Sequence, residues 1–368
     1  AAMLFALFLG EGLVRVFVPQ QLVHRQEGLW RPDSSLGWIH QENVDVIVNT
    51  GDRPARFVTD GRGYRINAPG EYESPSRPKF RVLVIGDSFV EGLMVNGEET
   101  FSKLLERDLN EKGVSVEVIN GGVSAWTPRQ YLLKAQEVWE VEHFDLGIVF
   151  LYVGNDLIKE SEGALIVKSV GTRPRFRWPR SLRYGELKVS FGYPLNYWLE
   201  SRSHLYVLLK ERGRVIAARI GLTAYDVAEV FFVTEKNDGR WEGTADICVE
   251  IERIFRRHDA SVVFVLLPAF YQVHEEIFQE YQRIVSIPDG ELDLEQPTRE
   301  FGKRMQERIS SPYIDMSAPL RSEAASGKRL FGHVDRHFNE EGHRVVAEQL
   351  LPVVLDMLSA SNRPDDAP

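Results

Sequence analysis

The sequence contains one cysteine, Cys248, in 368 residues, so no disulfide can form within the chain. This assigns no compartment, because proteins without disulfides occur on both sides of a membrane. An excess of basic residues is also lacking: 54 acidic residues outnumber 44 basic ones, for a net charge of −10, which does not favour nucleic acid as a partner. No repeat or long low-complexity segment is present. The remaining composition, 43% apolar and 27% charged, is that of a globular protein with a sizeable core.

The sequence also lacks a long apolar run. Residues 1–9 are continuously apolar, whereas a helix that crosses a bilayer needs roughly 20 such residues. The run continues toward Pro19 with Glu11 and Arg15 four positions apart, a spacing that favours a helix. We expect residues 1–19 to be a truncated membrane anchor or signal-anchor helix. The alternative is an amphipathic helix packed on the protein's own surface.

Residues 20–78 are expected to form a small β-rich lead-in. Apolar and polar residues alternate over residues 44–48, and turn sequences occur at residues 50–52 and 60–63. We expect this segment to cover one edge or the mouth of the main domain.

From residue 79 to residue 358, apolar strand-like runs alternate with helical patterns. The predicted strands are 80–85, 114–119, 146–153, 262–267 and 313–315, and the main predicted helices begin near residues 101, 128, 244, 297 and 339. This alternation predicts an α/β fold with a mostly parallel sheet covered on both faces. Residues 157–243 interrupt it with an insert rich in arginine and aromatic residues, which we interpret either as a substrate lid or as a solvated loop and helical hairpin. Residues 359–368 form a short polar tail.

A serine stands at the end of the first of these strands. In the segment from Lys79 to Gly92, a mostly apolar, β-rich run leads to Gly86-Asp87-Ser88. The carboxyl ends of parallel strands face the crevice where ligands of open α/β sheets bind. Ser88 is therefore a candidate nucleophile, although Gly-Asp-Ser alone can equally be a turn.

Later segments offer the other parts that an acyl-transfer site needs. A serine hydroxyl requires a base, usually a histidine oriented by a carboxylate. Among nine histidines, His337 is the best placed, because it follows Asp335 in a loop directly before the last predicted helix. Gly122 follows the second strand and Asn155 the third. The Gly122 N–H and the Asn155 amide could therefore converge with the Ser88 N–H on a developing oxyanion, where each donor contributes about 3 kcal/mol.

Together these segments resemble the SGNH, or GDSL-like, hydrolase family, whose four motif blocks carry Ser, Gly, Asn and His. The blocks are Gly86-Asp87-Ser88, Asn120-Gly121-Gly122-Val123-Ser124, Gly154-Asn155-Asp156 and Asp335-x-His337. The resemblance covers roughly residues 80–156 and 261–358. It implies a flavodoxin-like three-layer α/β/α sandwich with esterase, lipase or carbohydrate-deacetylase activity, without a cofactor or metal. It also implies a Ser88 nucleophile, a His337 base and an oxyanion hole formed by the Ser88 N–H, Gly122 and Asn155.

One feature departs from the family pattern. The commonest family spacing places the aspartate three residues before the histidine, whereas Asp335 stands two residues before His337 and Val334 occupies the usual position. We therefore expect either a Ser-His-Asp triad or a dyad in which a backbone carbonyl orients the imidazole.

The run over residues 335–343 is also similar to bacterial, often membrane-anchored, members of the family.

Three alternatives stay open. His333, Asp335, His337 and His343 could bind a metal, although this leaves the serine and the two oxyanion donors unexplained. The same serine could pass its acyl group to a sugar hydroxyl, as in an O-acyltransferase that acts on a cell-surface polysaccharide. The chain could also be a non-catalytic glycan-binding protein. We expect a short-chain ester hydrolase that removes short acyl groups such as acetyl, for example from carbohydrate. We expect it to be membrane-anchored, with its catalytic domain in the periplasm or outside the cell, and the cytoplasm is the alternative location.

Overall fold

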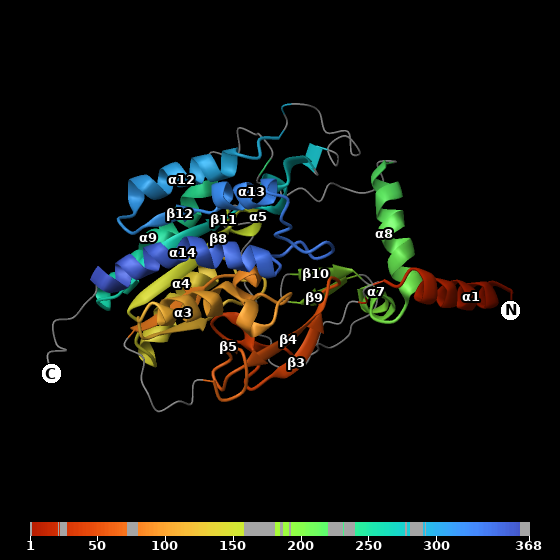
Figure 1. Ribbon diagram of the computed structural model, residues 1–368, viewed down its shortest axis with the longest axis horizontal. Coiled ribbons are helices and arrows are strands. Elements are labelled where there is room, and N and C mark those ends of the chain that lie inside the picture. Colours follow the sequence, from red (N-terminus) through yellow and green to blue (C-terminus); the bar gives the residue numbers. More distant parts are fainter. Residues whose placement is uncertain are drawn as a thin grey trace.

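The computed structural model describes residues 2–20, 22, 28–71, 80–157, 181–184, 187–190, 193–219, 231, 240–276, 278–279, 290 and 292–360. At its centre lies an eight-stranded sheet in the order β12-β11-β8-β6-β7-β5-β4-β3 (Figure 1). Neighbouring strands from β12 to β7 run parallel. These strands are β6 (Phe80–Ile85), β7 (Val116–Asn120), β8 (Leu146–Tyr152), β11 (Ser261–Leu267) and β12 (Tyr313–Asp315).

Helices cover both faces of this sheet. On one side lie α4 (Pro128–Glu137), α9 (Arg240–Arg257) and α12 (Gln296–Arg308), and on the other α3 (Phe101–Glu111), α13 (Ser317–Ala325) and α14 (Glu340–Ala360). Along β6, Leu83 and Ile85 pack with the first group, whereas Val82 and Val84 pack with the second. Alternate side chains of a strand point to opposite faces, so a strand that is apolar throughout needs cover on both. The predicted three-layer α/β/α fold is confirmed.

Residues 28–71 extend the main sheet. The strands β3 (Asp45–Asn49), β4 (Pro54–Thr59) and β5 (Arg65–Ile66) are antiparallel, and Arg65 of β5 pairs with Asn120 of β7. The hairpin β1 (Trp30–Asp33) and β2 (Gly37–His40) precedes them. The described part of this lead-in, which we expected to cover one edge or the mouth of the main domain, thus extends the main sheet at one edge. The alternating apolar residues in the sequence indicate strands here, but they do not identify the strand of the main sheet with which these strands pair.

Several short elements connect these layers. They are α2 (Ser88–Glu91), η1 (Gly97–Glu99), η2 (Val138–Glu140), α5 (Val153–Asp156) and α10 (Phe270–Val273). The helices α2 and α5 directly follow β6 and β8, so they begin at the carboxyl edge of the sheet.

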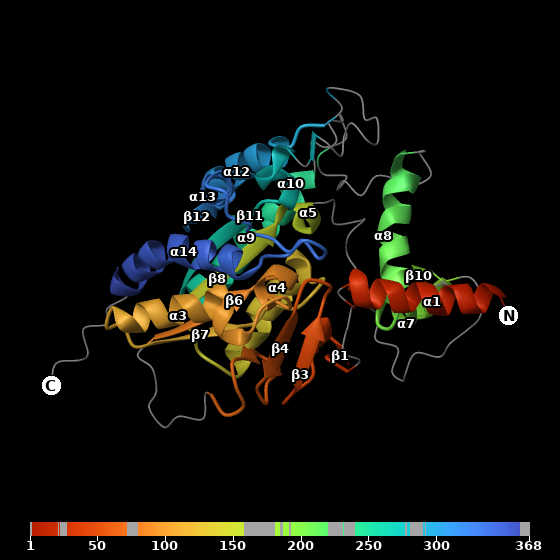
Figure 2. The ribbon, with the colours of Figure 1, turned by 45° about the vertical axis from the view of Figure 1, so that its right-hand side comes forward.

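Helix α1 (Ala2–Phe17) projects from the body and lies against α8 (His204–Arg219), near α7 (Tyr193–Glu200), as both views show (Figures 1 and 2). The Glu11 carboxylate accepts hydrogen bonds from the Ser203 hydroxyl at 2.8 Å and the Leu205 N–H at 2.9 Å. It thereby caps the beginning of α8. In the part of the chain that the structure describes, no helix has both the length and the apolar character needed to span a bilayer.

The predicted lid lies partly outside the described residues, which omit 158–180 and 220–230. Within the insert, β9 (Ser181–Tyr184) pairs with β10 (Leu187–Ser190), and α7 and α8 follow. Helix α8 contacts α1. The lid interpretation stays a prediction. Of the polar tail, residues 361–368 also lie outside the described part.

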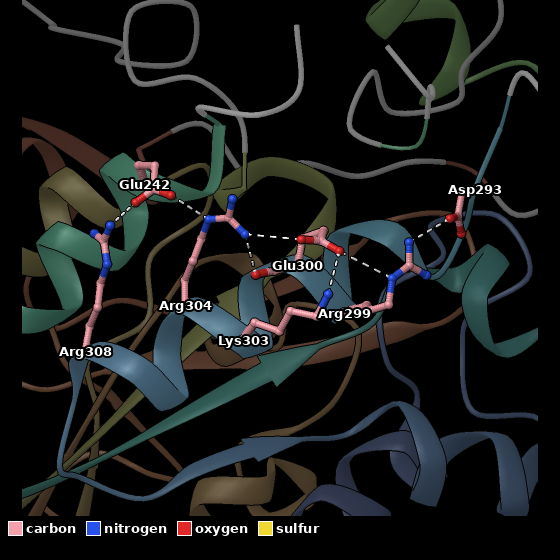
Figure 3. A network of polar contacts seen from close by, with 7 residues as sticks. All are labelled: Glu242, Asp293, Arg299, Glu300, Lys303, Arg304 and Arg308. Carbon is pink, nitrogen blue, oxygen red and sulfur yellow. Dashed lines mark hydrogen bonds and ion pairs between the residues drawn. The ribbon is translucent and has the colours of Figure 1, made fainter. Parts of the chain in front are cut away.

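A network of ion pairs joins α9 to α12 at the surface (Figure 3). Glu242 of α9 accepts a hydrogen bond from Arg304 Nε at 2.7 Å and another from Arg308. The network continues along α12 and the loop before it through Glu300, Lys303, Arg299 and Asp293. Exposed pairs of this kind contribute about 0–1 kcal/mol each to stability.

Candidate active site

Ser88 begins α2 immediately after β6. The Asp87 carboxylate accepts a hydrogen bond from the Phe89 N–H at 2.9 Å, which caps the short helix, and the helix ends at Gly92 with φ of 67°. A Cβ atom at Gly86 would lie 2.3 Å from a methyl carbon of Val90, so only glycine allows so tight a strand-to-helix turn. The turn places Ser88 at the carboxyl edge of the sheet, at the end of β6, which lies between β8 and β7.

The structure brings Ser88, His337 and Asp335 together in one chain of hydrogen bonds. Ser88 Oγ lies 2.7 Å from His337 Nε2, and His337 Nδ1 lies 2.7 Å from Asp335 Oδ1. An ionised carboxylate can only accept, so Nδ1 carries a proton and Nε2 is left to accept the serine proton. This is the arrangement in which imidazole activates a hydroxyl group.

The short aspartate-to-histidine spacing has a structural explanation. The loop closes where the Gly332 N–H donates to the His337 carbonyl at 2.8 Å, beside a bridge between the buried Phe331 and Phe338. At its tip, Arg336 has a φ of 61°, which is rare for a residue other than glycine. This left-handed residue turns the chain between Asp335 and His337, and their side chains meet although a single residue separates them.

Charge and burial shift the acid–base properties of the site. Burial lowers the pKa of His337, but the hydrogen bond and charge of Asp335, together with Asp87, outweigh it and raise this pKa above its ordinary 6.5. Burial raises the pKa of Asp87 above 3.8, although hydrogen bonds from the Phe89 N–H and the Asn155 amide act against it. The imidazolium form of His337 is therefore stabilised next to the serine, as a base that takes a proton requires.

The two predicted oxyanion donors follow the strands on either side of β6. The Gly122 N–H donates to the Asn120 side chain at 3.1 Å, and Asn155 Nδ2 donates to Asp87 Oδ2 at 2.8 Å. Both donors are therefore already engaged. A Cβ at Gly122 would lie 2.6 Å from the Glu91 nitrogen, so glycine is needed for this loop to approach α2 so closely. The Asn155 amide keeps a second N–H, while Gly122 would have to share its only one.

Sequence reasoning missed the buried polar group beneath Ser88. Glu91, the last residue of α2, has a fully buried side chain, and its carboxylate contacts His40 Nε2 at 2.6 Å and accepts from Trp30 Nε1 at 2.9 Å. The Ser124 hydroxyl donates to the same carboxylate. Glu91 follows the serine by three positions, but its partners lie on three separate segments. No local pattern in the sequence could have identified them.

Aromatic rings surround the serine and histidine. The Phe89 ring lies 4.8 Å from the His337 ring and 4.5 Å from the ring of Tyr152, centroid to centroid. The Arg336 guanidinium lies 5.3 Å from the centre of the Tyr271 ring and donates to the Tyr271 hydroxyl. Phe89 and Tyr271 are buried, so this packing supports His337 and Arg336 from within the protein, and Tyr152 is only partly exposed.

The four residues considered as metal ligands do not converge on one point: His343 and His333 have partners of their own, and Asp335 pairs with His337. His343 is buried in α14, where its Nδ1 accepts from the Phe101 N–H at 3.2 Å, and burial lowers its pKa to about 3. His333 Nδ1 contacts Arg329, and Asp335 contacts His337. Among the described residues, no group of three His, Cys, Asp or Glu side chains is arranged to hold a metal ion.

No protein-family model matches the chain, and no curated protein matches it. Among solved structures it is similar to TesA, with 10% identity, a TM-score of 0.38, and 75% of this chain and 99% of that chain covered. It is also similar to the acetyl xylan esterase AlAXEase, with 13% identity, a TM-score of 0.40 and coverages of 74% and 99%. For LAE5, an alpha/beta hydrolase enzyme from the metagenome of Lake Arreo, Spain, the values are 14%, 0.38, 78% and 99%. The function of the chain must therefore be argued from its own site.

Proposed function

We propose that the protein is a serine ester hydrolase with Ser88 as nucleophile, His337 as base and Asp335 as the carboxylate that orients the base. The observation that carries this proposal is the chain of two 2.7 Å hydrogen bonds from Ser88 through His337 to Asp335. It lies at the carboxyl edge of a parallel sheet, where ligands of such folds bind. A metal ion has no part in the proposed reaction.

In the proposed reaction, Ser88 Oγ attacks the ester carbonyl while its proton moves to His337 Nε2. The resulting oxyanion accepts hydrogen bonds from the Ser88 N–H, the Gly122 N–H and the second N–H of Asn155. His337 then gives its proton to the departing alkoxide, and the carbon–oxygen bond breaks to leave an acyl-enzyme. A water molecule then attacks this acyl group while His337 takes one of its protons. The bond between the acyl carbon and Ser88 Oγ breaks, His337 returns the proton to Oγ, and the acid is released.

We further propose a short acyl group, such as acetyl, carried on a carbohydrate. The partly exposed ring of Tyr152 and the exposed guanidinium of Arg336 support this substrate class. Aromatic faces pack against sugar rings, and nearby hydroxyl and guanidinium groups can bond sugar hydroxyls. If a sugar hydroxyl replaces water in the second step, the same site performs O-acyl transfer.

We also propose that α1 tethers the protein to a membrane, with the catalytic domain in the periplasm or outside the cell. Its apolar residues Phe5, Phe8 and Phe17 are 71%, 83% and 74% exposed. At about 100° per residue, these and the other exposed apolar residues cover most of the helix circumference, and Glu11 and Arg15 occupy the remaining side. Such a helix needs an apolar environment around it.

Flotation with lipid vesicles tests this proposal. The double variant Phe5→Ser/Phe8→Ser should no longer bind the vesicles, whereas Val141→Ser, at a residue that is 80% exposed on the main body, should still bind them.

Hydrolysis of p-nitrophenyl esters of increasing chain length tests the main proposal. We expect turnover of the acetate that resists chelators and is lost in Ser88→Ala, with slower turnover of longer chains. Activity that survives in Ser88→Ala, or that a chelator abolishes, would overturn the assignment. Addition of acetylated and free oligosaccharides to the same assay separates hydrolysis, which releases acetate, from transfer, which moves the acetyl group to the acceptor. Glycan binding without turnover would indicate a non-catalytic protein.

A further inference from the structure

The loop that carries Asp335 and His337 is exposed at its tip. Val334 is 51% exposed, and His333 and Arg336 are exposed as well. Burial anchors the base of the loop, at Phe331 and Phe338, and does not extend to the tip. The left-handed conformation of Arg336 is in addition unfavourable for a residue other than glycine. Some other interaction must therefore hold Asp335 against the imidazole.

Asp52 supplies this interaction from the opposite end of the chain. It lies in the turn between β3 and β4, and its carboxylate accepts from three successive backbone N–H groups of the loop, those of His333, Val334 and Asp335. The Val334 N–H lies 3.1 Å from both carboxylate oxygens, and the Asp335 N–H lies 2.9 Å from Oδ2. Successive N–H groups of this kind form a concavity that binds anions, and here a side-chain carboxylate fills it.

The turn that presents Asp52 is itself fixed in place. The neighbouring Arg53 forms ion pairs with Glu99 of η1 and with Glu340, the first residue of α14. Helix α14 begins just after the catalytic loop. On the other side, a Cβ at Gly332 would lie 2.7 Å from Asp52 Oδ2, so the loop backbone is packed directly on the carboxylate. The contact is therefore tight on both sides and leaves the loop little freedom.

We propose that Asp52 is a positioning residue for the reaction: it holds the backbone of residues 333–335 so that Asp335 meets His337 Nδ1 despite the short spacing. This inference rests on the proposed function. Asp52 acts through Asp335 and His337 and need not touch the substrate. The segment over residues 28–71 is then part of the catalytic unit, since it provides the residue that orders the loop of the base.

The variants Asp52→Ala and Asp52→Asn test this proposal. The alanine removes all three acceptor contacts, whereas the asparagine keeps the shape and one acceptor oxygen but loses the charge. We expect kcat for p-nitrophenyl acetate to fall about 100-fold in Asp52→Ala and about 10-fold in Asp52→Asn, because small misplacements of a catalytic group cost about this much. KM should change by less than about threefold, since substrate binding is not altered.

A matched control comes from Asp60, in the turn between β4 and β5. Its carboxylate also accepts from two backbone N–H groups, those of Arg62 and Tyr64, both at 2.9 Å, but it belongs to a different turn. Asp60→Asn should leave kcat unchanged. If the loss of a carboxylate in this segment acted only by destabilising the fold, kcat would instead fall in both Asp52→Asn and Asp60→Asn, in proportion to the stability that each variant loses.

Proton NMR gives a readout that needs no substrate. The Nδ1 proton of His337, bonded to Asp335, should give a strongly downfield resonance in the wild type that is absent in Asp335→Ala. We expect it to be lost in Asp52→Ala, weakened in Asp52→Asn and kept in Asp60→Asn. A folded Asp52→Ala with unchanged kcat and an unchanged resonance would overturn the role of Asp52. If Asp52→Ala does not fold, Asp52→Asn decides by the same two readouts.

Failure of the proposed function would look different. Turnover in Ser88→Ala, or no turnover of any ester by the wild type, would remove the esterase assignment. The resonance of His337 would still show whether Asp52 orders the loop.

Discussion

The buried carboxylate of Glu91 has three polar partners, so its removal should destabilise the protein strongly. In Glu91→Ala, the His40 imidazole, the Trp30 indole N–H and the Ser124 hydroxyl lose their common partner inside the protein. Removing one member of a buried charged group costs about 3–5 kcal/mol, because the remaining polar groups stay desolvated. We therefore expect the free energy of unfolding to fall by that amount.

Glu91→Gln should cost less. Its amide oxygen can still accept from Trp30 and His40, and its NH2 group can donate to the Ser124 oxygen, so we expect a loss of about 1–2 kcal/mol. Glu242→Ala is the surface control. That carboxylate also has two arginine partners, Arg304 and Arg308, but its side chain is 37% exposed, so the loss should be no more than about 1 kcal/mol.

Equilibrium unfolding in urea, followed by tryptophan fluorescence, measures these differences as shifts of the midpoint at constant slope. Because Glu91 ends the short helix that Ser88 begins, ester turnover by folded Glu91→Ala should fall as well. Equal stability losses in Glu91→Ala and Glu242→Ala would refute the reasoning. So would a Glu91→Ala protein with full turnover.

Three further predictions concern pH and the N-terminal helix. The pKa of His337 is raised and its neutral form is the proposed base, so kcat/KM should fall with decreasing pH through a value above 6.5. Asp335→Ala should move this acidic limb of the pH–rate profile to lower pH and should reduce kcat about 10³–10⁴-fold. His343 is buried with a pKa lowered to about 3, so the unfolded chain binds a proton that the folded one excludes. Stability should fall by up to about 1.4 kcal/mol per pH unit below about 6.5, and His343→Gln should reduce this slope in urea titrations, whereas an unchanged slope would contradict the assignment. Burial opposes ionisation of Glu11, but its hydrogen bonds outweigh this effect and lower its pKa to about 2. Its contact with α8 is therefore complete above about pH 4.5 and is lost as pH falls toward 2. Glu11→Gln should make the linker after α1 more sensitive to proteolysis at neutral pH, and equal cleavage of the wild type and the variant would count against this contact.

The parts of the site that follow strands could be predicted from the sequence. Apolar runs of strand length identified β6, β7 and β8, and parallel strands bring their carboxyl ends to one edge, so Ser88, Gly122 and Asn155 could be placed together from their positions alone. Which N–H groups are free could not be predicted. It depends on the partners Asn120 and Asp87, which the fold supplies.

The contacts that join distant segments were beyond sequence reasoning. Asp52 contacts the loop of Asp335 and His337 across more than 280 residues of chain, and His40 contacts Glu91 across 51. A carboxylate that accepts backbone N–H groups leaves no periodic pattern in the sequence. The pattern of a strand also does not identify its pairing partner, so the sequence could not show that β3, β4 and β5 extend the main sheet.

The most direct test of the central claim is covalent labelling with a fluorophosphonate, which reacts with a serine that a base has activated. After incubation and proteolysis, mass spectrometry locates the adduct. We expect it on Ser88 in the wild type, with labelling strongly reduced in His337→Ala and in Asp335→Ala. Absence of labelling at Ser88, or equally fast labelling of Ser88 in His337→Ala, would contradict the proposal that His337 activates this serine for attack on an ester.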